Sequence, residues 1–282
     1  FFFQAEDGIR DSSVTGFRRV LFRSGSPTLY NGKLYRLTLD AHLVALDMKT
    51  GKQLWKKPFA NHLEGYKGVS APLIANGVMI TGTSGGEHAT RGFLVGWDPE
   101  TGNELWRKHM IPAPGEPGHE TWPKTADSIP DAWKIGGAST WQNGSYDPEL
   151  DLVYWGVGNA GPYDPKYRGE GDALYTNCVV AIRPKTGEIV WHYQYTPNDL
   201  YDVDATNELV LAELRIDGQM RKVVMNGNKN GYFYVIDRTN GKLIAAHPMT
   251  RINWSTHVDL KTGRPVLTDV GDRLRKGEEV EV

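Results

Sequence analysis

The stretch that decides the fold is Ala-Leu-Asp-Met-Lys-Thr-Gly-Lys-Gln-Leu-Trp at residues 45–55. Related copies occupy residues 96–106, 181–191 and 235–244, and a weaker echo occupies residues 258–264. In each full copy an apolar pair is typical of the end of a strand. The polar residues that follow are typical of a tight turn, in which the glycine supplies a positive φ. In the first three copies a tryptophan four residues after that glycine belongs to the returning strand.

Short runs of apolar, β-branched and aromatic residues precede the copies and read as further strands. They are Lys33–Leu37, Val78–Thr81, Leu152–Val157 and Tyr232–Ile236. Nothing between them shows sustained helical spacing, and intervals of roughly fifty residues, with longer insertions between the second and third copies, suit the blades of a propeller. The sequence therefore predicts an all-β fold, a β-propeller in which Trp55, Trp106 and Trp191 pack between neighbouring blades.

Composition excludes several classes of protein. The 282 residues are 39% hydrophobic and 23% charged, which is ordinary for a globular chain. The formal net charge of −2 gives no electrostatic reason to expect nucleic acid or an anionic membrane as a partner. No apolar run approaches the roughly 18 residues of a membrane span. Cys178 is the only cysteine, so an internal disulfide is impossible.

The two ends of the chain differ from its interior. Residues 1–24 contain Gln-Ala-Glu-Asp-Gly-Ile-Arg-Asp and Phe-Arg-Arg-Val-Leu-Phe-Arg-Ser, which resemble a translated sequencing-library adapter. The alternative is a basic targeting leader, because arginines flank apolar residues there. We expect residues 1–24 to be foreign to the protein and residues 25–282 to form a partial propeller domain. Leu274–Val282 is a charged run without a closing element, so we expect a chain truncated at both ends.

The repeat resembles the tryptophan-docking motif of the alcohol dehydrogenases that depend on pyrroloquinoline quinone (PQQ), whose complete fold is an eight-bladed propeller. Non-enzymatic propellers carry the same repeat, so the segments between the copies are more specific. Five of them match the family in order and spacing over residues 27–270: Thr83–Glu87 with Arg91-Gly92 after it, Gly136–Trp141, Gly156–Asn159, Thr196–Asp202 and Asn228–Phe233. The resemblance implies that this chain carries about half of the propeller.

The resemblance also implies a set of cofactor-binding residues. PQQ is a planar tricarboxylate with a reactive ortho-quinone, and it needs a flat surface, donors for its carboxylates and a cation. Trp141 would be the surface on which the ring stacks, and Lys229 would point its ammonium at the quinone oxygens. Hydroxyls and closely approaching backbone N–H groups would come from Ser84, Gly85, Gly86 and Ser139.

The metal-binding and catalytic residues are implied in the same way. Glu87 and Asn159 would be hard oxygen ligands of the metal, and Asp202 would be both a ligand and the general base that takes the proton of the alcohol. Asp204 stands where the lanthanide-dependent branch has an aspartate, so the resemblance implies a lanthanide ion bound by Glu87, Asn159, Asp202 and Asp204. The alternative is a calcium enzyme in which Asp204 is exposed or lies outside the ligands. By themselves Asp199, Asp202 and Asp204 also suit solvated loop charges.

The sequence departs from the family pattern at a few positions. Val69 stands where the family usually has threonine, and Ser139 replaces another threonine but keeps the hydroxyl. The family's vicinal disulfide, a glutamate and an arginine that touches PQQ would precede residue 27. His88 follows Glu87, but no second histidine or cysteine stands at a metal-binding spacing, which favours a surface or packing role.

The functional expectation is a periplasmic quinoprotein dehydrogenase. It would oxidise a primary alcohol to an aldehyde, with hydride transfer to the quinone C5, and pass electrons to a c-type cytochrome. Two alternatives stay open. One is a non-catalytic propeller scaffold, and the other is a relative that oxidises sugars or polyols with the same cofactor.

Overall fold

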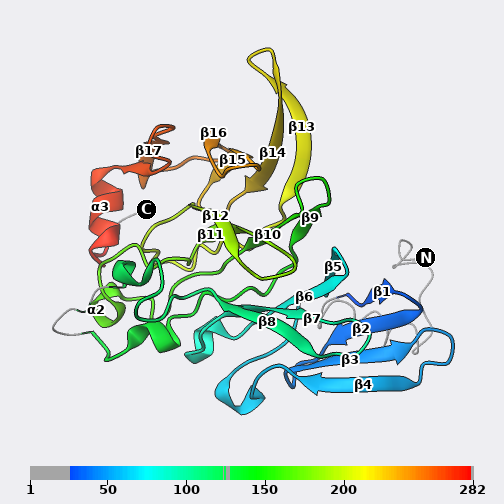
Figure 1. Cartoon of the computed structure of the whole chain (residues 1–282). Coiled ribbons are helices and arrows are strands. Elements are labelled where there is room, and N and C mark those ends of the chain that lie inside the picture. The colour runs from blue at the N-terminus through cyan, green and yellow to red at the C-terminus, as the bar shows by residue number, and fades with distance from the viewer. Residues whose placement is uncertain (1–25, 123, 125–127, 281–282) are drawn as a thin grey trace, which may run out of the picture.

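The structure is a computed structural model that describes residues 26–122, 124 and 128–280. Residues 1–24, which we expect to be foreign to the protein, lie outside the described residues. The described chain forms four four-stranded antiparallel sheets and one two-stranded sheet, which follow one another in sequence order (Figure 1). In each four-stranded sheet, neighbouring strands are consecutive in the chain, as in the blade of a propeller. The predicted all-β fold is confirmed.

The first sheet contains β1 (Thr28–Tyr30), β2 (Lys33–Leu37), β3 (His42–Asp47) and β4 (Gln53–Pro58). The second contains β5 (Leu73–Ala75), β6 (Val78–Gly82), β7 (Phe93–Trp97) and β8 (Glu104–His109). The third contains β9 (Ser145–Asp147), β10 (Leu152–Gly156), β11 (Cys178–Ile182) and β12 (Ile189–Gln194). The fourth contains β13 (Val210–Ile216), β14 (Gln219–Gly227), β15 (Tyr232–Asp237) and β16 (Leu243–Pro248), and the last sheet contains β17 (Ser255–Val258) and β18 (Pro265–Leu267).

Each full copy of the repeat forms the last hairpin of one sheet. In the first sheet, the side chain of Asp47 accepts hydrogen bonds from the backbone N–H of Lys49 at 3.1 Å and of Thr50 at 2.8 Å, and Gly51 has φ +70°. Before the turn, the pairing of β3 with β4 shifts between Ala45 and Leu46, and the other three sheets shift at the equivalent position. The repeat therefore specifies one local geometry, a bulge followed by a tight turn, four times over.

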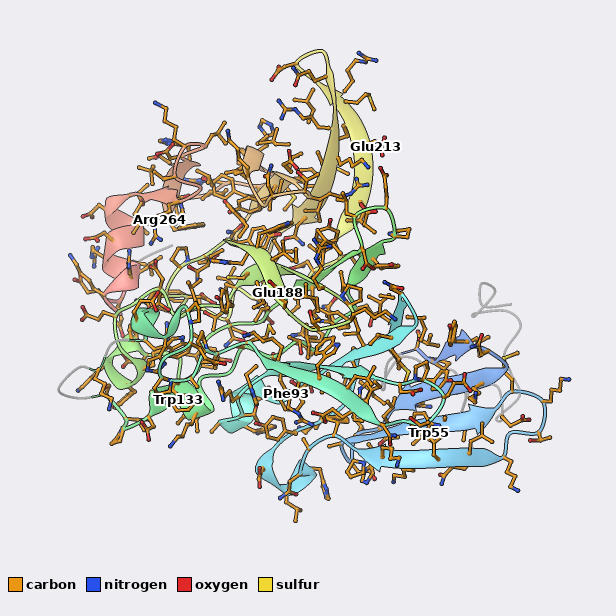
Figure 2. All side chains as sticks on the ribbon, viewed as in Figure 1. Trp55, Phe93, Trp133, Glu188, Glu213 and Arg264 are labelled. Atoms are coloured by element: carbon orange, nitrogen blue, oxygen red, sulfur yellow. The ribbon has the colours of Figure 1, made fainter. Side chains whose placement is uncertain are left out.

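The tryptophans of the repeat join each sheet to the next. Their indole N–H groups donate to backbone carbonyls of the following sheet: Trp55 to Glu100 at 3.2 Å, Trp106 to Pro184 at 2.9 Å and Trp191 to Arg238 at 3.2 Å. The turn glycine of the following sheet lies against each ring, and a Cβ on Gly187 would come within 2.5 Å of the Trp106 ring. The predicted packing of these side chains between blades is confirmed, and Trp55 is labelled in Figure 2.

The hydrophobic core is divided into three clusters, each between two successive four-stranded sheets. Tyr35 and Met79 belong to the cluster between the first and second sheets, and Trp155 belongs to the cluster between the second and third. Tyr234 belongs to the cluster between the third and fourth. Cys178 is fully buried, and this burial raises the pKa of its thiol well above the usual value. Stability thus arises mainly between neighbouring sheets.

Helices are short in the described residues. The 3-10 turns are η1 (His62–Glu64), η2 (Gly86–His88), η3 (His119–Thr121) and η4 (Ala132–Ile135), and the α-helices are α2 (Pro165–Arg168) and α3 (Asp269–Arg275). With seven residues, α3 is the longest helix described, and it is too short to cross a bilayer. Sequence reasoning did not anticipate α3, because a helix of two turns is too short to show a period. Its local signal is Thr268, whose side chain caps the N-terminus by accepting from the N–H of Gly271.

Candidate active site

Most of the predicted site residues line a single cavity of about 830 Å³. Eight of them, contributed by four segments far apart in the sequence, lie in its wall: Ser84, Gly85, Glu87, Ser139, Trp141, Asn159, Asp202 and Asp204. The remaining lining residues are Ser26, Val69, Ser70, Gln142, Asn143 and Tyr163. The fold therefore brings together side chains that the sequence separates by more than a hundred residues.

Backbone hydrogen bonds hold three of these segments together. The N–H of Thr140 donates to the carbonyl of Thr83 at 2.8 Å, which joins the second segment to the first. The N–H of Gly158 donates to the carbonyl of Ser139 at 2.7 Å, which joins the third segment to the second. The Ala138 N–H donates to the carbonyl of Asn159 at 2.9 Å and strengthens the same junction. One wall of the cavity is thus a continuous ladder of main-chain bonds.

Gly85 is required for a reason that the sequence did not suggest. We expected glycine here to let a cofactor approach the backbone; in addition, the side of Gly85 on which a Cβ would lie is filled by the chain itself. A Cβ would lie 2.2 Å from the carbonyl oxygen of Gly65, and Gly85 has φ +111°. Its neighbour Gly86 is absent from the cavity wall and lies against Ser139. Close packing of two segments is therefore a second reason for glycine at position 85.

Asp202 and Asp204 lie on a loop that Asp199 shapes. The buried carboxylate of Asp199 accepts hydrogen bonds from the backbone N–H of Tyr201 at 2.9 Å and of Val203 at 2.7 Å. Asp202 and Asp204 both have left-handed backbones, with φ +55° and +51°. Aspartate tolerates this conformation better than most residues, but two such positions so close together mark a conformation imposed by the surroundings.

Asp204 is the most perturbed acid of the site. The backbone N–H of Asn159 donates to its carboxylate at 3.0 Å. Burial raises the pKa of Asp204 to about 6, and the negative charge of Asp202 adds to the rise. The Asn159 N–H, the charge of Lys229 and a hydrogen bond with the Trp141 side chain act in the opposite direction. Two carboxylates that repel each other in one cavity favour a cation between them.

Tyr163 also belongs to the site, and sequence reasoning missed it. Burial raises the pKa of its phenol, and the charges of Asp202, Asp204 and Glu87 raise it further, whereas a hydrogen bond with Asn159 lowers it. All three predicted carboxylates thus raise the pKa of the Tyr163 phenol. The sequence offers one indication of this role, because Tyr163 stands only four residues after the predicted ligand Asn159.

Lys229 reaches the site through Asp202. Its ammonium donates to the backbone carbonyl of Asp202 and lies 3.6 Å from Oδ2 of the same residue. Lys229 is not in the wall of the large cavity; it lines a neighbouring cavity of about 320 Å³ instead. Both members of the pair are about half exposed, so solvent weakens the attraction.

The donor set suits a hard cation, since Glu87, Asn159, Asp202 and Asp204 all offer oxygen. No three His, Cys, Asp or Glu side chains within residues 26–122, 124 and 128–280 are close enough to hold a metal ion by themselves. A cation would therefore also need the Asn159 amide and oxygens of a bound molecule. His88, for which we expected a surface or packing role, is exposed, and its Nε2 lies 3.3 Å from the carboxylate of Glu87.

Fold and site together describe a tryptophan-docked β-propeller with a polar, anionic ligand cavity. Residues 56–251, well over half of the chain, match the model of the PQQ glucose/ethanol/alcohol dehydrogenase β-propeller domain. The chain belongs to this family.

Individual relatives agree with this assignment. The quinohemoprotein alcohol dehydrogenase ADH IIB of Pseudomonas putida is 45% identical over 84% of this chain and 36% of its own length. Among solved structures, the quinohemoprotein alcohol dehydrogenase ADHIIG of Pseudomonas putida HK5 superposes with a TM-score of 0.80 at 41% identity, over 87% of this chain and 37% of that one. A europium-containing methanol dehydrogenase superposes with a TM-score of 0.80 at 35% identity, over 87% of this chain and 45% of that one. The chain thus spans less than half the length of each.

Proposed function

We propose that this chain supplies the cofactor and metal pocket of a quinoprotein dehydrogenase that oxidises a primary alcohol to an aldehyde. One observation carries the proposal: Glu87, Asn159, Asp202 and Asp204 line the same cavity as the half-buried indole of Trp141. A scaffold propeller has no need to gather oxygen ligands beside a flat aromatic surface. The names of the relatives, which are alcohol and methanol dehydrogenases, support the same reaction class.

The residues of the chain have distinct roles in this proposal. When bound, PQQ would supply the redox chemistry, as the acceptor of the hydride from the alcohol. Trp141 would provide the stacking surface, and Ser84 and Ser139, which line the same cavity, would donate hydroxyl hydrogen bonds to the carboxylates of the cofactor. Asp202 would accept the proton of the alcohol, and the ammonium of Lys229, 3.6 Å from its Oδ2, would stabilise negative charge on the quinone oxygens.

For the metal we propose a lanthanide ion, with calcium as the alternative. The cavity wall carries three carboxylates and one amide, and such a strongly anionic lining suits a trivalent ion better than a divalent one. The solved relative that contains europium supports this choice. For the electron acceptor we propose a c-type cytochrome, and for the location the periplasm; the naming of relatives as quinohemoproteins is in keeping with a haem acceptor.

The reaction can be tested directly. The protein, produced from its native gene and purified, is supplied with PQQ and either lanthanum or calcium, and turnover of methanol and ethanol is followed with an artificial dye acceptor. We expect turnover with at least one of the two metals. Preference for glucose or glycerol over both alcohols would indicate the sugar- or polyol-oxidising alternative. A lack of turnover, combined with a failure to retain PQQ, would leave the scaffold alternative in its place.

The choice of metal depends on Asp204. With Asp204→Ala we expect lanthanum-supported activity to fall by about 10–100-fold, as is typical when metal-site residues are lost, and calcium-supported activity to fall less. The reason is that a trivalent ion loses more when an anionic oxygen is removed. The measurement is the metal concentration for half-maximal activity, together with the maximal rate, for each ion.

Asp217→Ala is the matched control for this substitution. Asp217 also has a left-handed backbone, with φ +49°, but it is an exposed turn residue and does not line the cavity. It therefore reports the backbone cost of alanine alone. If Asp204→Ala changes the responses to lanthanum and calcium by the same factor, the lanthanide assignment is wrong.

A further inference from the structure

Arg168, the last residue of α2, is buried although it carries a charge. Only 2% of its surface is exposed. Its guanidinium donates to the carbonyls of Pro162 at 2.6 Å, of Tyr163, and of Asp199 at 2.6 Å, and to the side-chain oxygen of Asn198 at 2.8 Å. All four acceptors are uncharged, so Arg168 is not one half of a buried ion pair.

These acceptors belong to the two loops that complete the cavity. One loop runs from Asn159 to Tyr163, and both of these residues line the cavity. The other begins at Asn198 and leads through the Asp199 turn to Asp202 and Asp204. The Nη1 of Arg168 bonds the first loop, and Nη2 bonds the second. A single side chain that does not line the cavity therefore bonds both loops.

The two loops also contact each other directly, at residues that line the cavity. There the backbone N–H of Asn159 donates to Asp204 at 3.0 Å. Two connections therefore join the same two loops. One is the set of hydrogen bonds from Arg168 to Pro162 and Asp199, and the other is the hydrogen bond from Asn159 to Asp204. With the loops joined in this way, a displacement of the Arg168 contacts shifts Asp202 and Asp204 relative to Asn159. Both aspartates have left-handed backbones, and they follow directly on the turn whose Asp199 carbonyl accepts from Arg168.

The chemistry of arginine explains why this residue occupies the position. A planar guanidinium presents donors on both sides in a fixed fork, so it can bond two loops at once and hold them in one geometry. A lysine ammonium is a compact point charge on a flexible stem and lacks that geometry. Burial of a cation is costly, and the hydrogen bonds that Nη1 and Nη2 of Arg168 donate to the two loops offset part of this cost.

We propose that Arg168 is a positioning residue for the site, which sets the distance between the loop of Asn159 and Tyr163 and the loop of Asp202 and Asp204. This inference rests on the proposed function, because it explains how the proposed ligands and the proposed base are kept in register. Arg168 touches neither cavity nor substrate and acts only through the two loops.

The test uses Arg168→Lys, which keeps the positive charge, and Arg238→Lys as a matched control. Arg238 is also a buried arginine, 6% exposed, and it donates to Asp147 at 2.6 Å, but it does not line the cavity. A third variant, Asn198→Gly, removes one acceptor of Arg168, and glycine suits the φ of +52° at that position. This milder change keeps the test available if Arg168→Lys fails to fold.

Two measurements on the purified protein separate positioning from general stability. The first is hydrogen exchange without cofactor, at the amides of Tyr201 and Val203, which the Asp199 turn protects. The second is binding of terbium ion to the PQQ-loaded protein, followed by emission sensitised by nearby aromatic side chains. For Arg168→Lys we expect faster exchange at these two amides and terbium affinity about 10–100-fold weaker, as is typical when support of a metal site is lost. Asn198→Gly should also speed exchange at these amides and weaken terbium binding, but by smaller factors than Arg168→Lys. Arg238→Lys should lower only the melting temperature.

The possible outcomes are distinct. Unchanged exchange at Tyr201 and Val203, or wild-type terbium affinity, in a folded Arg168→Lys variant overturns the positioning role. Equal losses in Arg168→Lys and Arg238→Lys overturn it as well, because a general loss of stability then explains both. If the unsubstituted protein binds neither PQQ nor terbium while the exchange result holds, Arg168 still anchors the loops and the proposed function is the part that fails.

Discussion

Replacement of Asp202 by asparagine should lower kcat for the alcohol by about 10²–10⁴-fold, the usual contribution of a general base. Asparagine has nearly the same shape and tolerates the left-handed backbone that Asp202 adopts, with φ +55°. It cannot accept a proton as a carboxylate does. Because the Lys229 ammonium donates to the backbone carbonyl of residue 202, that contact survives the change. The loss should therefore fall on the chemical step rather than on folding.

The measurement is the rate at saturating alcohol with a dye acceptor, together with the PQQ content of the purified variant. Asp164→Asn is the matched control. Asp164 caps α2 by accepting from the N–H of Lys166 at 2.8 Å, lies outside the cavity wall, and would be replaced by an equally good capping residue. A variant Asp202→Asn that keeps its PQQ and turns over at the wild-type rate would exclude Asp202 as the base.

Removal of one docking tryptophan should have the largest effect on stability. For Trp191→Ala we expect the free energy of unfolding to fall by about 3–5 kcal/mol, the usual range for a buried tryptophan. The side chain is 8% exposed, packs against Tyr154 with ring centroids 5.6 Å apart, and lies against Gly241 of the next sheet. Its indole N–H also donates to the carbonyl of Arg238, which would lose this partner.

The free energy of unfolding can be measured by urea denaturation, with tryptophan fluorescence and circular dichroism as two probes. Val190→Ala is the control, because Val190 is the neighbouring residue on β12 but is 42% exposed. Val190→Ala should lower the free energy of unfolding by well under half as much as Trp191→Ala. Comparable losses from the two substitutions would contradict the conclusion that the docking tryptophan joins the third sheet to the fourth.

Local features of the sequence predicted the fold well. The turn at Asp47–Gly51, the bulge before it and the tryptophan after it all lie within eleven residues, so each copy of the repeat specifies its own hairpin. The strand at Lys33–Leu37 has the predicted bounds for the same reason. The helix α3 was missed, since its only clear signal is the cap at Thr268.

The site could be predicted only in part. The residues that line the cavity were found as separate segments by resemblance to the family, and the fold gathers eight of the ten. Tyr163 was missed because its position depends on the conformation of the loop from Asn159 to Tyr163. Two carbonyls of that loop accept hydrogen bonds from Arg168. The second reason for Gly85 was missed as well, because nothing in the sequence places Gly65 next to it. Long-range contacts of this kind have no local signature.

Main-chain hydrogen bonds run from Thr83 through Ser139 to Gly158 along the cavity wall. The backbone thus sets the shape of this wall, and the side chains set its chemistry. Because amides and carbonyls make these bonds, a change of side chain at the cavity wall leaves the bonds themselves in place. Serine in place of threonine at position 139 is one such exchange, and valine at position 69 is another. Glycines such as Gly158 allow no such exchange, because any Cβ there would collide with Ser139 and Asp204.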